Sequence, residues 1–284
     1  MENVYVSLVD GISHVVFNRP MRKNSLTNEM YEALIGAIDA AARCLDTKVL
    51  LLSGADGVFT AGHDLDGFIE RPPQSINAPA FRFLSALARF EKPVVAAVEG
   101  VAIGIGATML MHCDLVYAAE DARFAMPFVN LGLVPEGASS LLLPRLCGHH
   151  RAAEVLLLGQ PIAAADAHAL GFVNRVLPIG EVLPFAIAQS KRLSALPAGS
   201  LRETKRLMKT PCEGDEATFT QLAREVELFV GRLGGPAARE AVAAFKNRTK
   251  PNFSGMASFV NAVRTYTSSL LHGWFISYHQ FHEP

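Results

Sequence analysis

The residues that could do chemistry stand in two short segments in the middle of the chain. Three glycines fall within residues 100–106, directly after the apolar run 94–98. Small residues at this density let backbone N–H groups approach a ligand, and N–H groups aimed at a carbonyl oxygen stabilise negative charge that develops there. Further along, Glu136 stands between Pro135 and Gly137, where its carboxyl group could accept and return a proton. The two segments together predict proton transfer beside a developing oxyanion.

Each of these features also has a plainer explanation. Glu136 could simply begin a helix, because an acidic side chain is favourable near the positive end of the helix dipole. The glycines could form a dinucleotide-binding fingerprint, but Met109 stands where that pattern needs its third glycine. His112 and Cys113 are neighbours, and no other His or Cys pair has ligand spacing, so we expect no metal site.

Length and composition restrict the class of protein. The chain has 284 residues, of which 50% are hydrophobic and 19% are charged, so it can bury a sizeable core. A net charge of −1 argues against a dedicated nucleic-acid surface, which would show a basic patch. We see no secretory signal and no run of the ~20 apolar residues that a spanning helix needs, so we expect a cytoplasmic protein without a membrane partner. The scattered cysteines are expected to be reduced thiols: Cys44, Cys113, Cys147 and Cys212.

The elements that must position the two segments follow an α/β pattern. Hydrophobic periodicity predicts strands in the first two thirds of the chain, at residues 4–9, 14–18, 49–52, 94–98, 114–118 and 172–176. Helices are expected between these strands, the first of them capped by Thr27. The last third reads as helices only, at residues 181–194, 199–209, 216–231 and 236–246. This order predicts an α/β core followed by a helical subdomain.

Four segments, in this order and at these intervals, resemble the crotonase (enoyl-CoA hydratase/isomerase) superfamily: Phe59–Leu65, Lys92–Gly100, Gly104–Gly106 and Cys113-Asp114. The resemblance covers roughly residues 3–253 and implies a spiral of ββα units with C-terminal helices that form trimers. It implies a spiral core with the acyl-CoA site in residues 1–195 and a helical subdomain in 196–253. Residues 254–284 are expected to be an atypical extension, non-native or loosely docked, although an amphipathic helix is an alternative.

The resemblance also implies the reactive groups. By motif position, the backbone N–H groups of His63 and Ile105 would clasp the oxygen of a CoA thioester. Hydratases of the superfamily use two glutamates, where this chain has Thr108 and Phe128. Since a hydroxyl and a phenyl ring cannot activate a water and return a proton, we expect no efficient hydration.

The segment Leu131–Gly137 instead resembles the Δ3,Δ2-enoyl-CoA isomerases, in which one glutamate is the catalytic base. Glu136 would take a proton from C2 of a 3-enoyl-CoA and return it at C4. Phe128 and Leu133 would form an apolar wall that raises the pKa of Glu136 toward neutrality.

Further residues are expected around the substrate for different reasons. Asp64 is expected to orient the segment Phe59–Leu65, the oxyanion loop, which carries His63. Arg22 and Lys23 are expected to bind the CoA phosphates. The whole predicted substrate-binding set is Arg22, Lys23, Ala61, Asp64, Leu65, Gly104, Thr108, Phe128 and Leu133. No cofactor is expected, because coenzyme A is part of the substrate, and the assembly is expected to be a homotrimer or hexamer. Other enolate chemistry on a CoA thioester, or silent acyl-CoA binding, remain the alternatives.

Overall fold

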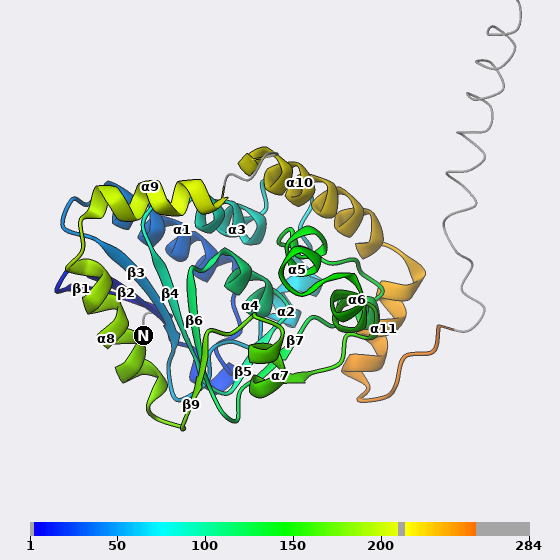
Figure 1. Cartoon of the computed structure of the whole chain (residues 1–284). Helices are drawn as coiled ribbons and strands as arrows, with labels where there is room; N and C mark the ends of the chain where they lie inside the picture. The colour runs from blue at the N-terminus through cyan, green and yellow to red at the C-terminus, as the bar shows by residue number, and fades with distance from the viewer. Residues whose placement is uncertain (1–2, 210–213, 254–284) are drawn as a thin grey trace, which may run out of the picture.

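A six-stranded sheet forms the centre of the computed structural model, which describes residues 3–209 and 214–253 (Figure 1). Its strand order is β1-β2-β3-β4-β6-β9. The strands are β1 (Val4–Val9), β2 (Ile12–Phe17), β3 (Val49–Gly54), β4 (Val94–Val98), β6 (Leu115–Ala119) and β9 (Arg175–Leu177). The β1–β2 pair is an antiparallel hairpin, and all other neighbours are parallel.

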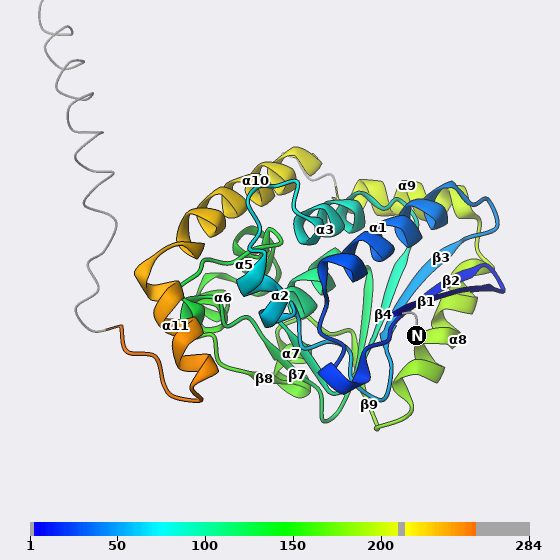
Figure 2. The same cartoon turned by 180° about the vertical axis from the view of Figure 1, so that it is seen from behind.

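The central strands are buried on both faces, as expected for parallel strands between helices. Every residue of β4 is buried, and so is every residue of β3 except Gly54. Helix α1 (Asn28–Arg43) covers one face and α8 (Val182–Ser194) the other (Figure 2). Thr27 caps α1 as predicted, because its hydroxyl accepts a hydrogen bond from the N–H of Met30 at 3.3 Å.

A second, three-stranded sheet was not predicted from the sequence. It contains β5 (Val101–Ile103), β7 (Arg123–Ala125) and β8 (Ile162–Ala163). Between β5 and β6 lie α4 (Ile105–Thr108) and the short 3-10 helix η2 (Met109–His112). The remaining elements before α8 are η1 (Pro20–Arg22), α2 (Leu65–Glu70), α3 (Pro79–Arg89), η3 (Val129–Leu131), α5 (Ser139–Cys147), α6 (His149–Leu158) and α7 (Ala164–Ala169).

The strand expected at residues 172–176 begins later than predicted, at Arg175. The N–H groups of Phe172 and Val173 donate to the carbonyl of Ala167, at 2.9 and 3.2 Å, and so close the turn after α7. Their apolar side chains are buried in the core without joining the sheet.

The last third of the described chain is helical, as predicted. It contains α9 (Ala198–Lys209), α10 (Gly214–Leu233) and α11 (Pro236–Lys246). Helix α10 lies over α3 and α5 (Figure 1). None of the helices within residues 3–209 and 214–253 is long and apolar enough to cross a membrane. Cys212 and the extension at 254–284 lie outside the described residues.

Candidate active site

The oxyanion loop and the glycine-rich segment lie against each other. The N–H of Thr60 donates to the carbonyl of Val101 at 2.9 Å, and the N–H of Ile103 donates back to Thr60 at 3.2 Å. Gly62 has a φ of +86°, and a Cβ built on it would lie only 2.3 Å from the carbonyl oxygen of Ile103. Only glycine fits here, so the glycine allows residues 60–63 to run directly along β5.

The predicted pair of donors sits on these two adjoining backbones. Ile105 is the first residue of α4, where an N–H group has no partner within the helix. A Cβ built on Gly106, the next residue, would lie 3.8 Å from the backbone nitrogen of Gly62, the residue before His63. Neither the N–H of His63 nor that of Ile105 donates a hydrogen bond to any residue that the structure describes. Both groups therefore remain available to a ligand oxygen.

Asp64 holds the oxyanion loop in place. It is the N-cap of α2, where Oδ1 accepts a hydrogen bond from the N–H of Gly67 at 3.0 Å. Oδ2 accepts from the guanidinium of Arg19 and from the hydroxyl of Ser25. Burial alone would raise the pKa of Asp64, but the hydrogen bonds from Arg19 and Gly67 outweigh it and hold the pKa below its usual value. These contacts tie the start of α2 to Arg19 and Ser25.

The half-buried side chain of His63 packs against Tyr31 and Phe68. The hydroxyl of Tyr31 lies 3.1 Å from its Nδ1, and the ring of Phe68 meets it edge-on. Burial lowers the pKa of His63 to about 4, so its ring is neutral at neutral pH. Tyr31 was not among the predicted site residues.

Glu136 is buried beside the helix that the glycines begin. Only 3% of its surface is exposed. The hydroxyl of Thr108 donates to Oε1, while Oε2 is buried without a partner among the described residues. The turn presses closely on α4, since a Cβ on Gly137 would lie 2.9 Å from Cβ of Thr108. Nε2 of His112 lies 2.9 Å from the carbonyl oxygen of Gly137 and fixes the turn from η2.

Burial is the main cause that raises the pKa of Glu136 to about 8. The hydrogen bond from Thr108 lowers the pKa, and the nearby carboxyl group of Glu225 raises it. The direction is the one predicted from the sequence, and Phe128 and Leu133 are both buried, at 6% and 7% exposure. A carboxyl group with a pKa near neutrality can both take up and release a proton under physiological conditions.

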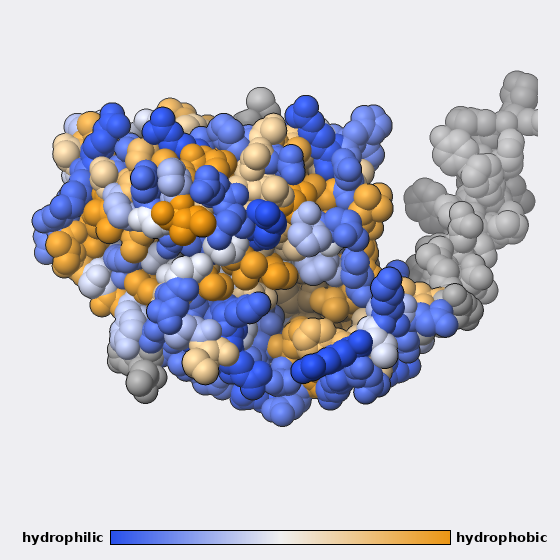
Figure 3. All heavy atoms as spheres, turned by 90° about the horizontal axis from the view of Figure 1, so that it is seen from below, coloured by the Kyte–Doolittle hydropathy of each residue, from blue (hydrophilic) through white to orange (hydrophobic). Residues whose placement is uncertain are grey.

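Some of the predicted substrate-binding residues line two cavities. Leu65 and Leu133 line a mainly apolar cavity of about 360 Å³ between α2 and α11, with Lys246 also on its wall. Arg22 lines a polar cavity of about 230 Å³ together with His63. Seen from below, the surface has a hollow whose floor is hydrophobic and whose rim is hydrophilic (Figure 3).

The remaining predicted residues lie on the same loops. The N–H of Ala61 donates to the carbonyl of Lys23 at 2.9 Å, which ties the loop after η1 to the oxyanion loop. The side chain of Lys23 is exposed. Gly104 is the N-cap of α4, and its N–H donates to the carbonyl of Ala125 at 2.8 Å.

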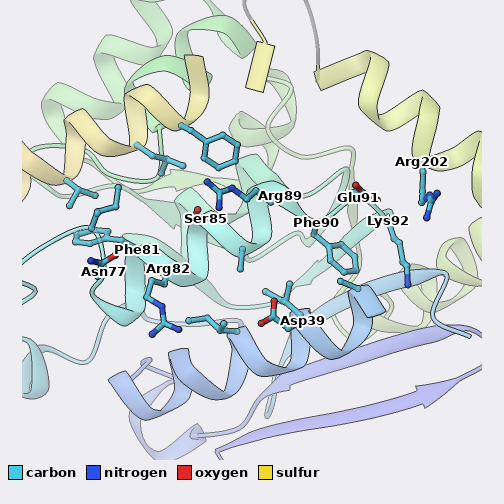
Figure 4. A pocket seen from close by; sticks show the side chains of 18 residues that line it. Asp39, Asn77, Phe81, Arg82, Ser85, Arg89, Phe90, Glu91, Lys92 and Arg202 are labelled. Carbon is cyan, nitrogen blue, oxygen red and sulfur yellow. The ribbon is translucent and has the colours of Figure 1, made fainter. Parts of the chain in front are cut away.

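A larger cavity of about 730 Å³ contains none of the predicted site residues. It lies between α1, α3, α9 and α10, and Arg82, Arg89, Lys92 and Arg202 are on its wall (Figure 4). Neither Glu136 nor its partner Thr108 lines this cavity. Its size is therefore no argument for placing the reaction there.

Comparison with known proteins agrees with this geometry. The chain is 33% identical to human enoyl-CoA delta isomerase 2 over 87% of its own length, and spans 64% of that protein. It is also 33% identical to the 1,2-epoxyphenylacetyl-CoA isomerase of Escherichia coli strain K12, covering 90% of this chain and 99% of that one. A crystal structure of an enoyl-CoA hydratase/isomerase from Pseudoalteromonas atlantica T6c superposes with a TM-score of 0.84 at 36% identity, over 89% of this chain and all of that one.

The family model described as enoyl-CoA hydratase/isomerase matches residues 8–256. With the two sheets, the C-terminal helices and the adjoining oxyanion and glycine segments, this match shows that the chain is an enzyme of the enoyl-CoA hydratase/isomerase (crotonase) family.

Proposed function

We propose that this enzyme moves the double bond of an enoyl-CoA from position 3 to position 2, with Glu136 as the only acid–base group. The observation that carries the proposal is the buried carboxyl group of Glu136, whose Oε2 has no partner among the described residues. A buried carboxyl oxygen without a partner is costly, and a substrate C–H that becomes acidic would give it a function.

The proposed reaction balances without water. The thioester oxygen accepts hydrogen bonds from the N–H groups of His63 and Ile105. The carboxylate of Glu136 removes a proton from C2, the electron pair of that C–H bond forms a C1–C2 double bond, and the carbonyl electrons move onto oxygen, which leaves a dienolate that still contains the 3,4 double bond. Each of these two fixed N–H groups can stabilise this negative charge by ~3 kcal/mol. The protonated Glu136 then donates to C4, so the double bond lies between C2 and C3 and the enzyme returns to its starting state.

Hydration is less well supported by the side chains that face Glu136. Water addition needs a second acid–base group. The two positions at which the resembled hydratases carry their glutamates are occupied here by Thr108 and Phe128. The hydroxyl of Thr108 already donates a hydrogen bond to Glu136. The other buried carboxyl group nearby, Glu225, accepts hydrogen bonds from the protein backbone and is engaged there. One carboxyl group suffices for moving a proton but not for activating water.

The two cavities suggest how an acyl-CoA would lie. The apolar cavity lined by Leu65 and Leu133 would accept the acyl chain. The polar cavity with Arg22, and the exposed Lys23 beside it, would face the phosphates of coenzyme A, since guanidinium and ammonium groups bind phosphate well.

A panel of CoA thioesters tests the proposal. Purified enzyme is given a 3-enoyl-CoA, a 2-enoyl-CoA and a saturated acyl-CoA in deuterium oxide. We expect conversion of the 3-enoyl-CoA to the 2-enoyl-CoA and no water addition. Fast hydration of the 2-enoyl-CoA, or hydrolysis of the thioester, would show that the enzyme catalyses one of these reactions and would contradict the proposed isomerisation. Binding of all three without deuterium uptake at C2 would indicate a catalytically silent acyl-CoA-binding protein.

A further inference from the structure

Glu225 belongs to α10, yet its side chain is buried against the segment that carries Glu136. Only 3% of Glu225 is exposed. The N–H of Ala138 donates to its Oε2 at 2.6 Å, and the N–H of Ser140 donates to its Oε1 at 3.0 Å. The hydroxyl of Ser140 also donates to Oε1. A carboxylate is an acceptor-only group, so three donors on one side chain fit the ionised form.

These contacts support a backbone that would otherwise be unfavourable. Ala138 has a φ of 57°, in the left-handed region that non-glycine residues avoid. It is also the N-cap of α5, and its own side chain provides no cap. Glu225, 87 residues further along the chain, supplies the missing cap and places its negative charge at the positive end of α5. Gln221, one turn earlier on α10, donates to the hydroxyl oxygen of Ser140 at 2.7 Å and completes the network.

Three consecutive residues are therefore held by three different partners. Thr108 donates to the side chain of Glu136, and His112 bonds to the carbonyl of Gly137. The next residue, Ala138, donates its N–H to Glu225. The first two partners come from α4 and η2, but the third comes from the C-terminal helices. The direction in which Glu136 points thus depends on the docking of α10.

The two carboxyl groups also interact through their charges. Burial is the main cause that raises the pKa of Glu136 to about 8, and the charge of Glu225 adds to it. Burial likewise raises the pKa of Glu225 to about 7, against its hydrogen bonds. Among the residues that the structure describes, the other polar side chains that interact with Glu136 are the neutral Thr108 and the buried phenol of Tyr31. Loss of the charge on Glu225 should therefore make Glu136 more acidic.

We propose that Glu225 is a positioning residue for the proton transfer: from α10 it fixes the backbone two residues beyond Glu136 and so directs that carboxyl group toward the substrate carbon. The catalytic consequence rests on the function proposed above. The effect on Glu136 itself does not, because it can be measured without substrate.

The test compares two substitutions on the same helix. Glu225→Gln keeps the shape of the side chain but removes its charge and one of its two carboxylate acceptors. Glu227→Gln removes the same charge from an exposed position of α10 and is the matched control. In each background, the titration of Glu136 is read as the infrared carboxyl difference between the protein and its Glu136→Gln counterpart. The constants kcat and KM are then measured with a 3-enoyl-CoA.

We expect Glu225→Gln to lower the pKa of Glu136 by roughly one pH unit. It should lower kcat by roughly tenfold while KM changes by less than about twofold, since a misdirected base affects the chemical step. Glu227→Gln should alter none of these values. A Glu225→Gln protein that is folded and matches the control in both titration and kcat overturns the proposal.

Two further outcomes are informative. A shifted titration in an enzyme that shows no isomerase activity in any background supports the coupling between Glu225 and Glu136 and contradicts the proposed reaction. If Glu225→Gln does not fold, Ser140→Ala removes only the hydroxyl donor to Glu225 and should shift the titration of Glu136 in the same direction by a smaller amount. An unchanged titration in folded Ser140→Ala then counts against the proposal.

Discussion

The hydroxyl of Thr108 donates a hydrogen bond to one carboxyl oxygen of Glu136, and the other oxygen is buried with no partner among the described residues. Thr108 therefore stabilises the ionised form of a group that burial would keep protonated. This relationship explains why Thr108, which stands where hydratases carry an acid, can still be part of the site.

Replacing Thr108 tests this relationship. Thr108→Val removes the hydroxyl at nearly constant shape, so the pKa of Glu136 should rise further. Since the reaction needs the carboxylate, the acid limb of the kcat/KM profile should move to higher pH, and activity at neutral pH should fall about tenfold. Thr108→Ser keeps the hydroxyl and should stay close to wild type. If the acid limb does not move in Thr108→Val, the hydroxyl of Thr108 has no effect on the pKa of Glu136.

The stability of the protein should report the burial of Glu136. Its pKa is raised from 4.5 to about 8 in the folded state, so between these values the folded protein keeps a proton that the unfolded chain has lost. The free energy of unfolding contributed by this group therefore falls as pH rises through that window. Glu136→Gln is neutral throughout, so it should gain stability relative to wild type between pH 5 and pH 8. Urea unfolding at the two pH values measures this, and a pH-independent difference would contradict the raised pKa.

The close contact between the oxyanion loop and β5 should make Gly62 intolerant of a side chain. Gly62→Ala would place a Cβ 2.3 Å from the carbonyl oxygen of Ile103, in a left-handed backbone. The matched control is Gly57→Ala, which has a φ of +68° and no atom within 4 Å of the new Cβ. The control should cost about 1–2 kcal/mol of unfolding free energy, and Gly62→Ala at least ~2 kcal/mol more. Equal costs would show that the loop can move away from β5 without penalty.

Reversal of the charge at Arg22 should weaken substrate binding. Arg22 lines the polar cavity beside His63 and is exposed, with Asp66 3.3 Å away. Arg22→Glu should raise KM for a CoA substrate by roughly tenfold at low salt with little change in kcat, and the effect should shrink at high salt. Arg151→Glu on α6, also exposed, makes the same charge change elsewhere and should leave KM unaltered. An unchanged KM in Arg22→Glu removes this residue from the substrate site.

The elements that could be predicted from the sequence are those with a strong local pattern. Long apolar runs marked β3 and β4, and Thr27 marked the start of α1 with a side chain that caps its own helix. The strands of the second sheet are two or three residues long, which is too short for an alternating pattern to emerge. Phe172 and Val173 looked like strand residues because they are buried, but burial in a turn and burial in a sheet require the same side chains.

In the candidate site, too, the residues in local motifs could be proposed from the sequence and the others could not. His63, Ile105 and Glu136 could be proposed from the sequence because each lies in a short motif that resembles the family, and the structure brings their segments together. Tyr31 and Glu225 contact the site from α1 and α10 through the packing of helix faces that are far apart in the chain. Such contacts leave no local signal, so nothing in the spacing of residues pointed to them.

The central claim is that one carboxyl group, that of Glu136, moves the proton. The most direct measurement is the rate at which a 3-enoyl-CoA becomes a 2-enoyl-CoA in wild type and in Glu136→Gln, with the fold of the variant verified by its thermal unfolding. Removal of the only acid–base group should lower kcat by about 10²–10⁴-fold. A folded Glu136→Gln variant that isomerises the substrate at the wild-type rate would contradict the account.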